Sequence, residues 1–583
     1  MKKSKLLLPL SILGLFALVG CGNSTSSSES STTDSGSSST STTSVATSDA
    51  EDIEETSVAD DSITSDFTLV NSSGTAVTPS GGVYTLSAAD TYTASGKLSE
   101  GQILVNAADA EVVLELDGVS ITNSSESPIY STTCDTLKVK AKADTNNYIY
   151  DKRTTDYSTT TGTDGMAAIY CYDGDLDLVG KGNLYVYSYQ NSGVQSKDNV
   201  KVKNQTLVIR AQNNGIKGND KVTIEENPTI DIYADNNGII TSNSDVGSSA
   251  QHGYVYLNGG TTIINSNGDG IDAAYAIVTG TSTDDDGVAY APSVAIYTDV
   301  YSAFYNSSVS SLSAVKYAYG GQSGNMGPGG QTSGTSSADK SEESSKGLKA
   351  GSYIEMSVGS IYSKNHDDGL HANKDSLESG STGTGAITVS GGEVKIYSSD
   401  DGLHAEGALK VSGGTVNVLT SHEGVEGNTI AISGGTVIVT PVNTTDSEGV
   451  SIATDDAINA SSSLTISGGY VDASVNSGGD YDCLDSNGSF TMTGGVVVAR
   501  GPNNGTAGAI DVDGAVKMSG GTLLVCGSIA GSSTSLATSR SVTSTASSGS
   551  HSITVDGTTY SFTNSYTYSS CACYSSTSSV STK

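Results

Sequence analysis

Short runs of alternating apolar and polar residues, separated by glycine-rich turns, fill most of the chain. Residues 409–411 (LKV) and 416–418 (VNV) are typical, because apolar side chains flank a polar one in each. A period of two residues indicates a strand with one buried face, and runs this short are typical of strands rather than helices. The pattern therefore predicts an all-β protein built from many short strands.

A four-residue unit recurs along these runs. It consists of any residue, a small residue, an apolar residue and usually a polar one, and successive units begin at least 22 residues apart. A second marker, Ser-Gly-Gly or Thr-Gly-Gly, interleaves with it, as at Gly413 and Gly414. A repeating period of this length is typical of a repeat architecture. The units begin at Ser192, Asn214, Asn237, Asp269, Lys346, Asp368, Asp401, Glu423, Asp456 and Asp482.

A coil of about 22 residues has room for three short strands and three corners. Coils of this kind stack into a parallel β-helix, which places equivalent residues in columns about 4.8 Å apart along the axis. A β-propeller is the competing architecture, but it needs a period of about 40–45 residues. The repeat therefore predicts a solenoid with an apolar ladder inside.

The rest of the chain is divided around this solenoid. Residues 66–151 have longer strand patterns and are interpreted as an N-terminal capping β region, and residues 152–526 as the parallel β-helix. Within the helix, the Gly/Ser-rich residues 320–345 are interpreted as an insertion loop. Residues 527–583 are interpreted as a C-terminal β cap and tail.

The N-terminus has the features of an export signal. Residues 1–20 begin with three lysines among their first five positions and continue as an apolar run of signal-peptide length. The segment 18–21 (LVGC) resembles the lipobox of bacterial lipoproteins, which implies cleavage before Cys21 and lipidation of its thiol; an ordinary secreted protein is the alternative. Residues 21–65 are too polar to fold and are interpreted as a disordered tether. We expect a cell-surface protein, lipid-anchored to the outer face of the bacterial membrane.

The charge balance limits the partners. There are 63 acidic and 28 basic residues, a net charge of −35. Nucleic acids and anionic membranes require clustered Lys and Arg, so we expect no nucleic-acid partner, membrane contact only through the lipid anchor, and a monomer. The chain has no Trp, which excludes a flat strip of indoles for crystalline cellulose, but its 30 Tyr could stack on sugars. Among the cysteines, Cys571 and Cys573 are the best candidates for a disulfide to another site.

Several segments resemble successive blocks of one known family. They are residues 82–87 (GVYTLS), 101–105 (GQILV), 116–121 (LDGVSI), 193–198 (GVQSKD), 214–220 (NGIKGND) and 269–272 (DGID). The family is that of bacterial carbohydrate-binding parallel β-helix lipoproteins, typified by a clostridial protein that binds cellulose and polygalacturonate. The resemblance runs from about Thr68 to Phe562. It implies a right-handed parallel β-helix related to pectate lyases, bound Ca²⁺, and binding of acidic plant polysaccharide.

Acidic residues gather in two columns of the C-terminal coils. Carboxylates one coil apart repel by roughly 1 kcal/mol in water and more in a protein, so a ladder of them favours an intervening cation. Clustered oxygens suit Ca²⁺. The alternative is that Asp-Gly forms a tight turn, in which Asp caps the turn and Gly takes a positive φ. The predicted metal ligands are Asp269, Asp272, Asp368, Asp401, Glu423, Glu426, Asp456, Asp482 and Asp485.

Two histidines occupy the same position of twin motifs, DDGLHA, at His371 and His404. Their role is either sugar hydrogen bonding or zinc-like ligation, and a solvated hydrogen-bonding ladder of turn residues is an equal alternative. The predicted carbohydrate-binding residues are His371, His404, Lys349, Lys374 and Tyr397.

Enzymatic activity is the less favoured hypothesis. A pectate lyase needs Ca²⁺ and a Lys or Arg base. Lys349 and Lys374 are available, but none of the four arginines adjoins the acidic columns in the repeat register. The Gly-His-Gly and Arg-x-Lys motifs of β-helix polygalacturonases are absent from the sequence. We therefore assign no catalytic residue and predict Ca²⁺-dependent binding of acidic polysaccharide such as pectin, with cellulose as a further ligand. A Ca²⁺-dependent polysaccharide lyase and a structural or adhesive surface solenoid are the alternatives.

Overall fold

The computed structural model describes most of the chain from residue 63 onward. The described ranges are 63–154, 167–245, 251–298, 344–440, 444–445, 451–452, 456–475, 481–502, 507–536, 539–542 and 545–583. The expected signal peptide, Cys21, nearly all of the tether and most of the 320–345 insertion therefore lie outside the described residues. Every element within these ranges is a β-strand. Accordingly, the described part contains no helix that could cross a membrane.

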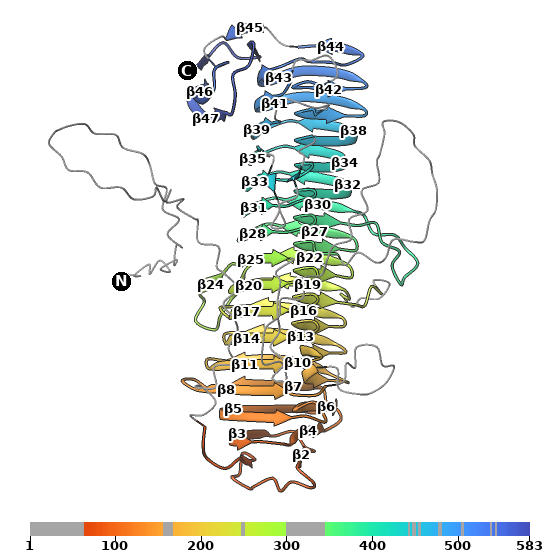
Figure 1. Cartoon of the computed structure of the whole chain (residues 1–583), viewed down its shortest axis with the longest axis vertical. Coiled ribbons are helices and arrows are strands. Elements are labelled where there is room, and N and C mark those ends of the chain that lie inside the picture. The colour runs from red at the N-terminus through yellow and green to blue at the C-terminus, as the bar shows by residue number, and fades with distance from the viewer. Residues whose placement is uncertain are drawn as a thin grey trace, which may run out of the picture. The chain divides into compact units, whose positions relative to one another are not determined.

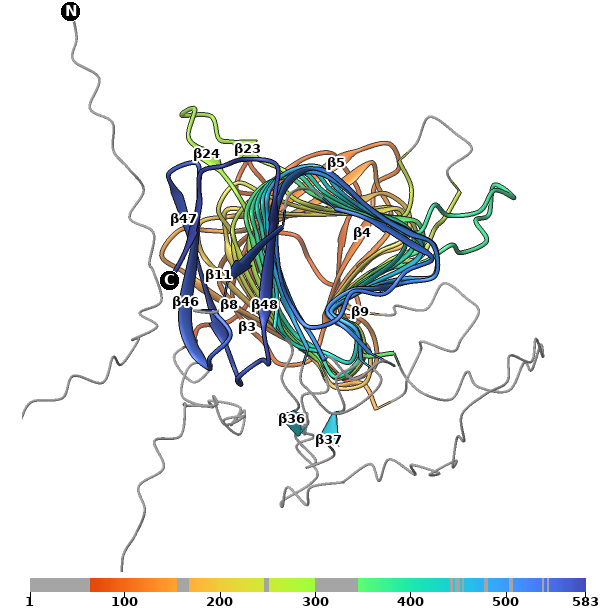
Figure 2. The same cartoon turned by 90° about the horizontal axis from the view of Figure 1, so that it is seen from above.

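The strands wind into a parallel β-helix with three sheets, as the repeat predicted. Each coil contributes a strand, or part of a longer strand, to each sheet and pairs in parallel with the coils before and after it (Figure 1). Seen along the stack, the coils superimpose around a common interior (Figure 2). The alternating residues explain this arrangement, because every second side chain faces that interior.

Within each coil, the strand of the first sheet comes after the third-sheet strand and the corner that ends it. Its central strands are β7 (Thr136–Ala141), β10 (Asp175–Gly180), β13 (Asn199–Lys203), β16 (Lys221–Glu225), β19 (Tyr254–Leu257), β22 (Ala276–Thr279), β27 (Tyr353–Met356) and β30 (Ala386–Val389).

The second sheet comes next in each coil. Its central strands are β8 (Asn146–Asp151), β11 (Asn183–Ser188), β14 (Thr206–Ala211), β17 (Thr229–Ala234), β20 (Thr261–Ser266), β25 (Ser293–Thr298), β28 (Ser360–Lys364), β31 (Glu393–Tyr397), β33 (Thr415–Thr420), β35 (Thr436–Val439) and β39 (Tyr470–Ser474).

The third sheet carries the four-residue units. Its strands are β2 (Val83–Leu86), β4 (Gln102–Asn106), β6 (Ile129–Thr133), β9 (Ala167–Cys171), β12 (Ser192–Ser196), β15 (Ile216–Gly218), β18 (Ile239–Thr241), β21 (Ile271–Ala273), β26 (Leu348–Ala350), β29 (Leu370–Ala372), β40 (Leu484–Ser486) and β42 (Asp511–Val512), together with the beginnings of β32 (Leu403–Val411), β34 (Val425–Ile432) and β38 (Ile458–Ile466).

An apolar ladder fills the interior. The third residue of each unit points inward, and Leu348, Leu370 and Leu403 stack in register with no exposed surface. Burial of apolar surface, worth roughly 25 cal/mol per Å², stabilises each coil only when its neighbours are present. The ladder therefore fixes which residues of the unit face outward.

The N-terminal segment contributes coils of its own. Strand β1 (Thr68–Val70) is antiparallel to β3 (Thr91–Leu98), and parallel stacking already begins where β3 pairs with β5 (Glu111–Asn123) and β2 with β4. The strands from β2 to β8 therefore already belong to the parallel stack, and the antiparallel β1 lies at its beginning.

The C-terminal segment forms a β cap. After β41 (Ser489–Arg500) and β43 (Ala515–Cys526), strand β48 (Cys571–Ser575) pairs antiparallel with both β43 and β45 (Ser539–Val542). A disulfide joins Cys526 to Cys571, one of the two cysteines that the sequence favoured. The other strands are β44 (Ser533–Ser535), β46 (Gly549–Val555), β47 (Thr558–Asn564) and β49 (Val580–Thr582), and two small hairpins are β23 (Ser282–Thr283) with β24 (Ala289–Tyr290) and β36 (Thr444–Thr445) with β37 (Ser451–Ile452).

Candidate functional site

The outward-facing residues of the third sheet form one continuous column. The strand register aligns Gln195, Lys217, Ile240, Asp272, Lys349, His371, His404, Glu426, Asn459 and Asp485. This is the second column that the repeat predicted, and the register confirms its alignment.

The column is longer at both ends than the sequence suggested. Asp511 follows Asp485, while Tyr170 precedes Gln195 and pairs with Tyr130. The missed units begin with alanine at residue 167 and glycine at residue 508. The small–apolar–polar order at residues 509–511, 26 residues after the preceding unit, was the available signal for Asp511.

The second residue of each unit lies where neighbouring coils come closest. A Cβ on Gly369 would lie 2.5 Å from the carbonyl oxygen of Gly402, and one on Gly402 would lie 2.4 Å from that of Gly424. None of these three glycines has a positive φ. The expectation that the Asp-Gly glycine supplies a left-handed turn is therefore wrong for these units, because close approach of the backbone selects glycine there. A positive φ occurs instead at the second glycine of the Gly-Gly marker, for example 74° at Gly414.

In the units that begin with Asn or Asp, the first residue binds the backbone of the next coil. Asp368 Oδ1 accepts a hydrogen bond from the Asp401 N–H at 3.0 Å, and Asp401 Oδ1 accepts one from the Glu423 N–H at 3.2 Å. Asp456 does the same for the Asp482 N–H at 2.7 Å. One oxygen of each of these carboxylates thus joins two coils.

Lys346 and Lys349 neutralise part of the negative charge of the stacked carboxylates. Lys349 Nζ lies 3.3 Å from Asp269 Oδ2 and 3.8 Å from Asp272 Oδ2. Burial disfavours the charge on Lys349, but the facing carboxylates outweigh burial and raise its pKa. Burial raises the pKa of Asp272 to about 6, although Lys349 opposes the shift. Lys346 Nζ similarly lies 2.7 Å from Asp367 Oδ1 and 2.8 Å from Asp368 Oδ2.

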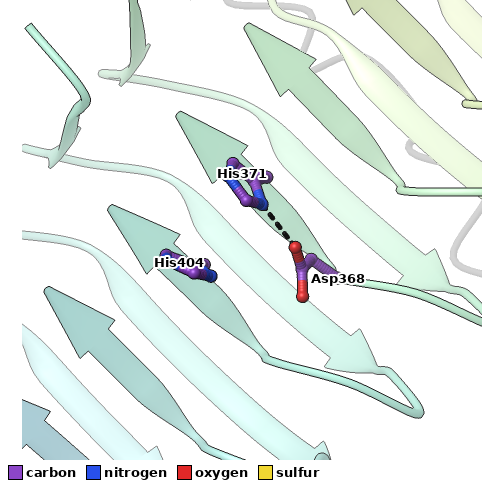
Figure 3. Close-up of side chains that lie close together, drawn as sticks. All are labelled: Asp368, His371 and His404. Carbon is purple, nitrogen blue, oxygen red and sulfur yellow. Dashed lines mark hydrogen bonds and ion pairs between the residues drawn. The ribbon is translucent and has the colours of Figure 1, made fainter. Parts of the chain in front are cut away.

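The two histidines lie on adjacent strands, β29 and β32, with ring centroids 4.4 Å apart (Figure 3). His371 Nδ1 is hydrogen-bonded to Asp368 Oδ2. His404 Nδ1 lies 3.0 Å from Asp401 Oδ2, and its Nε2 lies 3.2 Å from Glu426 Oε2. Each imidazole is therefore oriented by a carboxylate of its own unit.

The charges around His404 favour its protonated form. Burial opposes the imidazolium, but the hydrogen bond to Asp401 and the charge of Glu426 outweigh burial and raise the pKa of His404 to about 9. Burial raises the pKa of Glu426 to about 7, although His404 opposes the shift. The pKa of Asp368 is held well below its usual range, because His371 and Lys346 overcome the effect of its burial. Concentrated negative charge here attracts a cation.

Groups of three metal-ligating side chains form in one part of the described chain, between Asp367 and Glu426. The ligand atoms of each group lie within 4.8 Å of one another. The groups are Asp368, His371 and His404; Asp400, Asp401 and His422; Asp401, His404 and Glu426; and Asp367, Asp368 and Asp400. The last is made of oxygen ligands alone and fits Ca²⁺.

The predicted metal ligands are divided by this geometry. Asp368, Asp401 and Glu426 belong to the groups, whereas Asp269, Asp272, Glu423, Asp456, Asp482 and Asp485 lie outside them. Asp367, Asp400 and His422 were missing from the predicted set. The paired aspartates of the twin DDGLHA motifs were the signal for Asp367 and Asp400, because each directly precedes the first residue of a unit and lies at the same corner of its coil.

The predicted carbohydrate-binding residues lie on different parts of the molecule. Lys349, His371 and His404 share the third-sheet column. Tyr397 ends β31 of the second sheet, with its ring centroid 5.8 Å from that of Tyr362. Lys374 follows β29 and donates hydrogen bonds from its amide and its ammonium to Glu406.

The fold and the third-sheet column define a class: parallel β-helix proteins that present a column of ionisable side chains on one sheet. The chain matches the family described as carbohydrate-binding domain-containing protein over residues 80–402 and again over residues 375–505, and it belongs to that family.

Two relatives illustrate the family. A carbohydrate-binding domain-containing protein from Acetivibrio thermocellus is 32% identical over 212 residues, which cover 36% of this chain and 66% of that relative. The chain thus spans less than two thirds of the relative's length. A solved structure titled as the polysaccharide lyase-like protein from C. thermocellum, a gadolinium derivative, has 29% identity and covers 38% of this chain and 84% of its own, with a TM-score of 0.33.

Proposed function

We propose that the protein binds acidic polysaccharide, such as polygalacturonate, in a Ca²⁺-dependent way at the third-sheet face around Asp367, Asp368 and Asp400. Membership of a carbohydrate-binding family supports a sugar ligand. The observation that carries the acidic specificity is the all-oxygen group of three carboxylates at this face. A bound Ca²⁺ would let uronate carboxylates approach a protein of net charge −35.

The periodicity of the face suits a polymer. Equivalent side chains recur at each coil, so a regular chain of sugars could make the same contact repeatedly. Lys346 already lies against Asp367 and Asp368, so Ca²⁺ would share these carboxylates with an ammonium group. Binding should therefore weaken with added salt as well as with chelation.

The contacts of Lys349 and Lys374, the two bases that the sequence offered near the acidic columns, argue against a lyase. A general base must lose its proton near neutral pH, which requires a lowered lysine pKa. The pKa of Lys349 is instead raised by Asp272 and Asp269 against the effect of burial. Lys374 donates to Glu406. Binding without cleavage is the function that these contacts favour.

The test is a pull-down on polygalacturonate, cellulose and an uncharged glucan, with Ca²⁺ or with EDTA. We expect Ca²⁺-dependent retention on polygalacturonate that is lost in the double variant Asp367→Asn/Asp400→Asn. These residues are chosen because Asp368 and Asp401 also join adjacent coils. The exposed pair Asp285→Asn/Asp286→Asn changes the charge equally and serves as the matched control. Retention on polygalacturonate that is unchanged by EDTA and by Asp367→Asn/Asp400→Asn would contradict the proposal. No retention on any of the glycans would favour a structural or adhesive solenoid.

We also propose that the protein is a cell-surface lipoprotein anchored through Cys21. The proposal is supported by the apolar run and lipobox-like ending of residues 1–21. Cys21→Ser should leave unprocessed precursor in cells and abolish incorporation of labelled fatty acid. Normal processing of the variant, with lipid still attached, would count against this anchor.

A further inference from the structure

The paired imidazoles of the third-sheet column have the arrangement of a nitrogen-rich metal site. His371 and His404 occupy equivalent positions on adjacent coils, and their ring centroids are 4.4 Å apart (Figure 3). Together with Asp368 they bring three ligand atoms within 4.8 Å of one another. Two imidazole nitrogens, completed by a nearby carboxylate, are a donor set that zinc and related divalent ions accept.

The hydrogen bonding of His371 leaves one nitrogen available. Its Nδ1 is hydrogen-bonded to Asp368, whereas its Nε2 is buried and has no hydrogen-bond partner among the described residues. The residue is 9% exposed. A carboxylate that holds one imidazole nitrogen, and so directs the other toward a metal, is the usual support of a metal-bound histidine. A buried nitrogen without a partner otherwise costs free energy, which a ligand would recover.

The charge around the pair favours a divalent cation. Five carboxylates, those of Asp367, Asp368, Asp400, Asp401 and Glu426, belong to the ligand groups at this part of the column. Lys346 contacts two of them. His404 lies between Asp401 and Glu426, whose charges favour its protonated form, so a metal that binds this imidazole must displace its proton and would then occupy the same negatively charged surroundings.

We propose that His371, through its Nε2, and His404 form a binding site for a transition-metal ion of the zinc class, distinct in its chemistry from a Ca²⁺ site, in which Asp368 orients His371 through Nδ1. Asp401 would hold His404 through Nδ1, and Glu426, which lies beside His404 Nε2, would supply the oxygen ligand. Metal binding at this site does not require polysaccharide, so it can be tested separately from the proposed sugar binding.

The test uses Co²⁺ as a spectroscopic probe with chelator-stripped protein containing the whole folded chain. We expect about one equivalent of Co²⁺ to bind with visible absorption bands of a nitrogen-ligated ion, to be displaced by Zn²⁺, and not to be displaced by a large excess of Ca²⁺. Zn²⁺ should also raise the melting temperature.

Single variants His371→Gln and His404→Gln keep a hydrogen-bonding side chain and should each weaken Co²⁺ binding by at least tenfold. His551→Gln, in the C-terminal cap, is the matched control and should bind normally. Circular dichroism verifies that each variant is folded. If a variant does not fold, Zn²⁺ protection of the wild-type histidines from diethyl pyrocarbonate, resolved by mass spectrometry, decides the ligands. Unchanged binding in both variants, full displacement by Ca²⁺, or absence of Co²⁺ bands in the folded parent would each overturn the proposal.

Discussion

Each residue of the repeated unit has a distinct physical task, and two of the four tasks connect one coil to the next. An Asn or Asp at the first position accepts a hydrogen bond from an amide of the following coil, as Asp368 does from Asp401. The second must be small because the coils are in backbone contact there. The third packs inside, and the fourth points away from the interior. Lysine, histidine, acid and amide side chains all occur at the fourth position.

The close approach at the second position gives a sharp test. In Gly369→Ala the new Cβ would lie 2.5 Å from the Gly402 oxygen and 2.6 Å from Ile396 Cγ2, so we expect a loss of about 1–3 kcal/mol in stability. Gly427→Ala is the matched control, because its Cβ would meet nothing closer than 3.3 Å and Ala405 and Ala460 occupy the same column. Thermal melts of both variants measure the difference, and equal melting temperatures would contradict the explanation.

The amide-accepting role of the first position predicts which substitutions it tolerates. Asn214 and Asn237 already fill this role in earlier coils through their side-chain oxygens. Asp456→Asn should therefore change stability by less than about 0.5 kcal/mol, whereas Asp456→Ala should cost about 1–2 kcal/mol because the Asp482 N–H loses its acceptor. Denaturant unfolding compares them. If the two variants were equally stable, the hydrogen bond from the Asp482 N–H to the Asp456 side chain would not contribute to joining these coils.

At the scale of elements, the sequence was sufficient for the fold because the repeat encodes the strand register directly. Units such as those at Asp368 and Asp401 align as their spacing predicted. The metal-ligating groups were less predictable, because Asp367, Asp400 and His422 lie beside the column rather than in it. The lysine contacts were also missed: Lys349 was predicted to bind sugar, yet its ammonium group lies against Asp269 and Asp272. Spacing along the chain determines which residues share a column, but it does not determine which side-chain atoms meet.

The disulfide is the covalent link between the last coil and the C-terminal cap. Cys526 ends β43, and Cys571 begins β48 after a separation of 45 residues. Closing a loop of this length restricts the unfolded chain, so Cys526→Ser/Cys571→Ser should lose about 2–4 kcal/mol. Denaturant unfolding with and without dithiothreitol measures the effect. Reduction should destabilise the parent and leave the double variant unchanged; a parent insensitive to reduction would contradict this role.

At the scale of the whole described solenoid, the caps resolve a problem that stacked strands always create. An end coil exposes unpaired backbone groups and apolar residues, which promote association between molecules. At the C-terminal end, the outward residues of the second sheet are themselves apolar: Val496, Val498 and Leu524 are at most 5% exposed. They pack with Ile553 and Phe562 of the cap in a second hydrophobic cluster. The cap therefore covers a face as well as an end.

Removal of the cap should convert this covered face into an association surface. A chain that ends at Cys526 would lose β44, β45 and β48 from the sheet edge and would expose Val496, Val498 and Leu524 together. Contiguous apolar surface of this kind associates in water, so we expect the shortened chain to elute as oligomers or aggregates in size-exclusion chromatography with light scattering, and the full chain as a monomer. The triple substitution Val496→Thr/Val498→Thr/Leu524→Thr in the shortened chain should reduce association, because it removes apolar area without altering the inward-facing ladder. A shortened chain that stays monomeric and folded would contradict this role. The strands at the end of the solenoid would then prevent association without the cap.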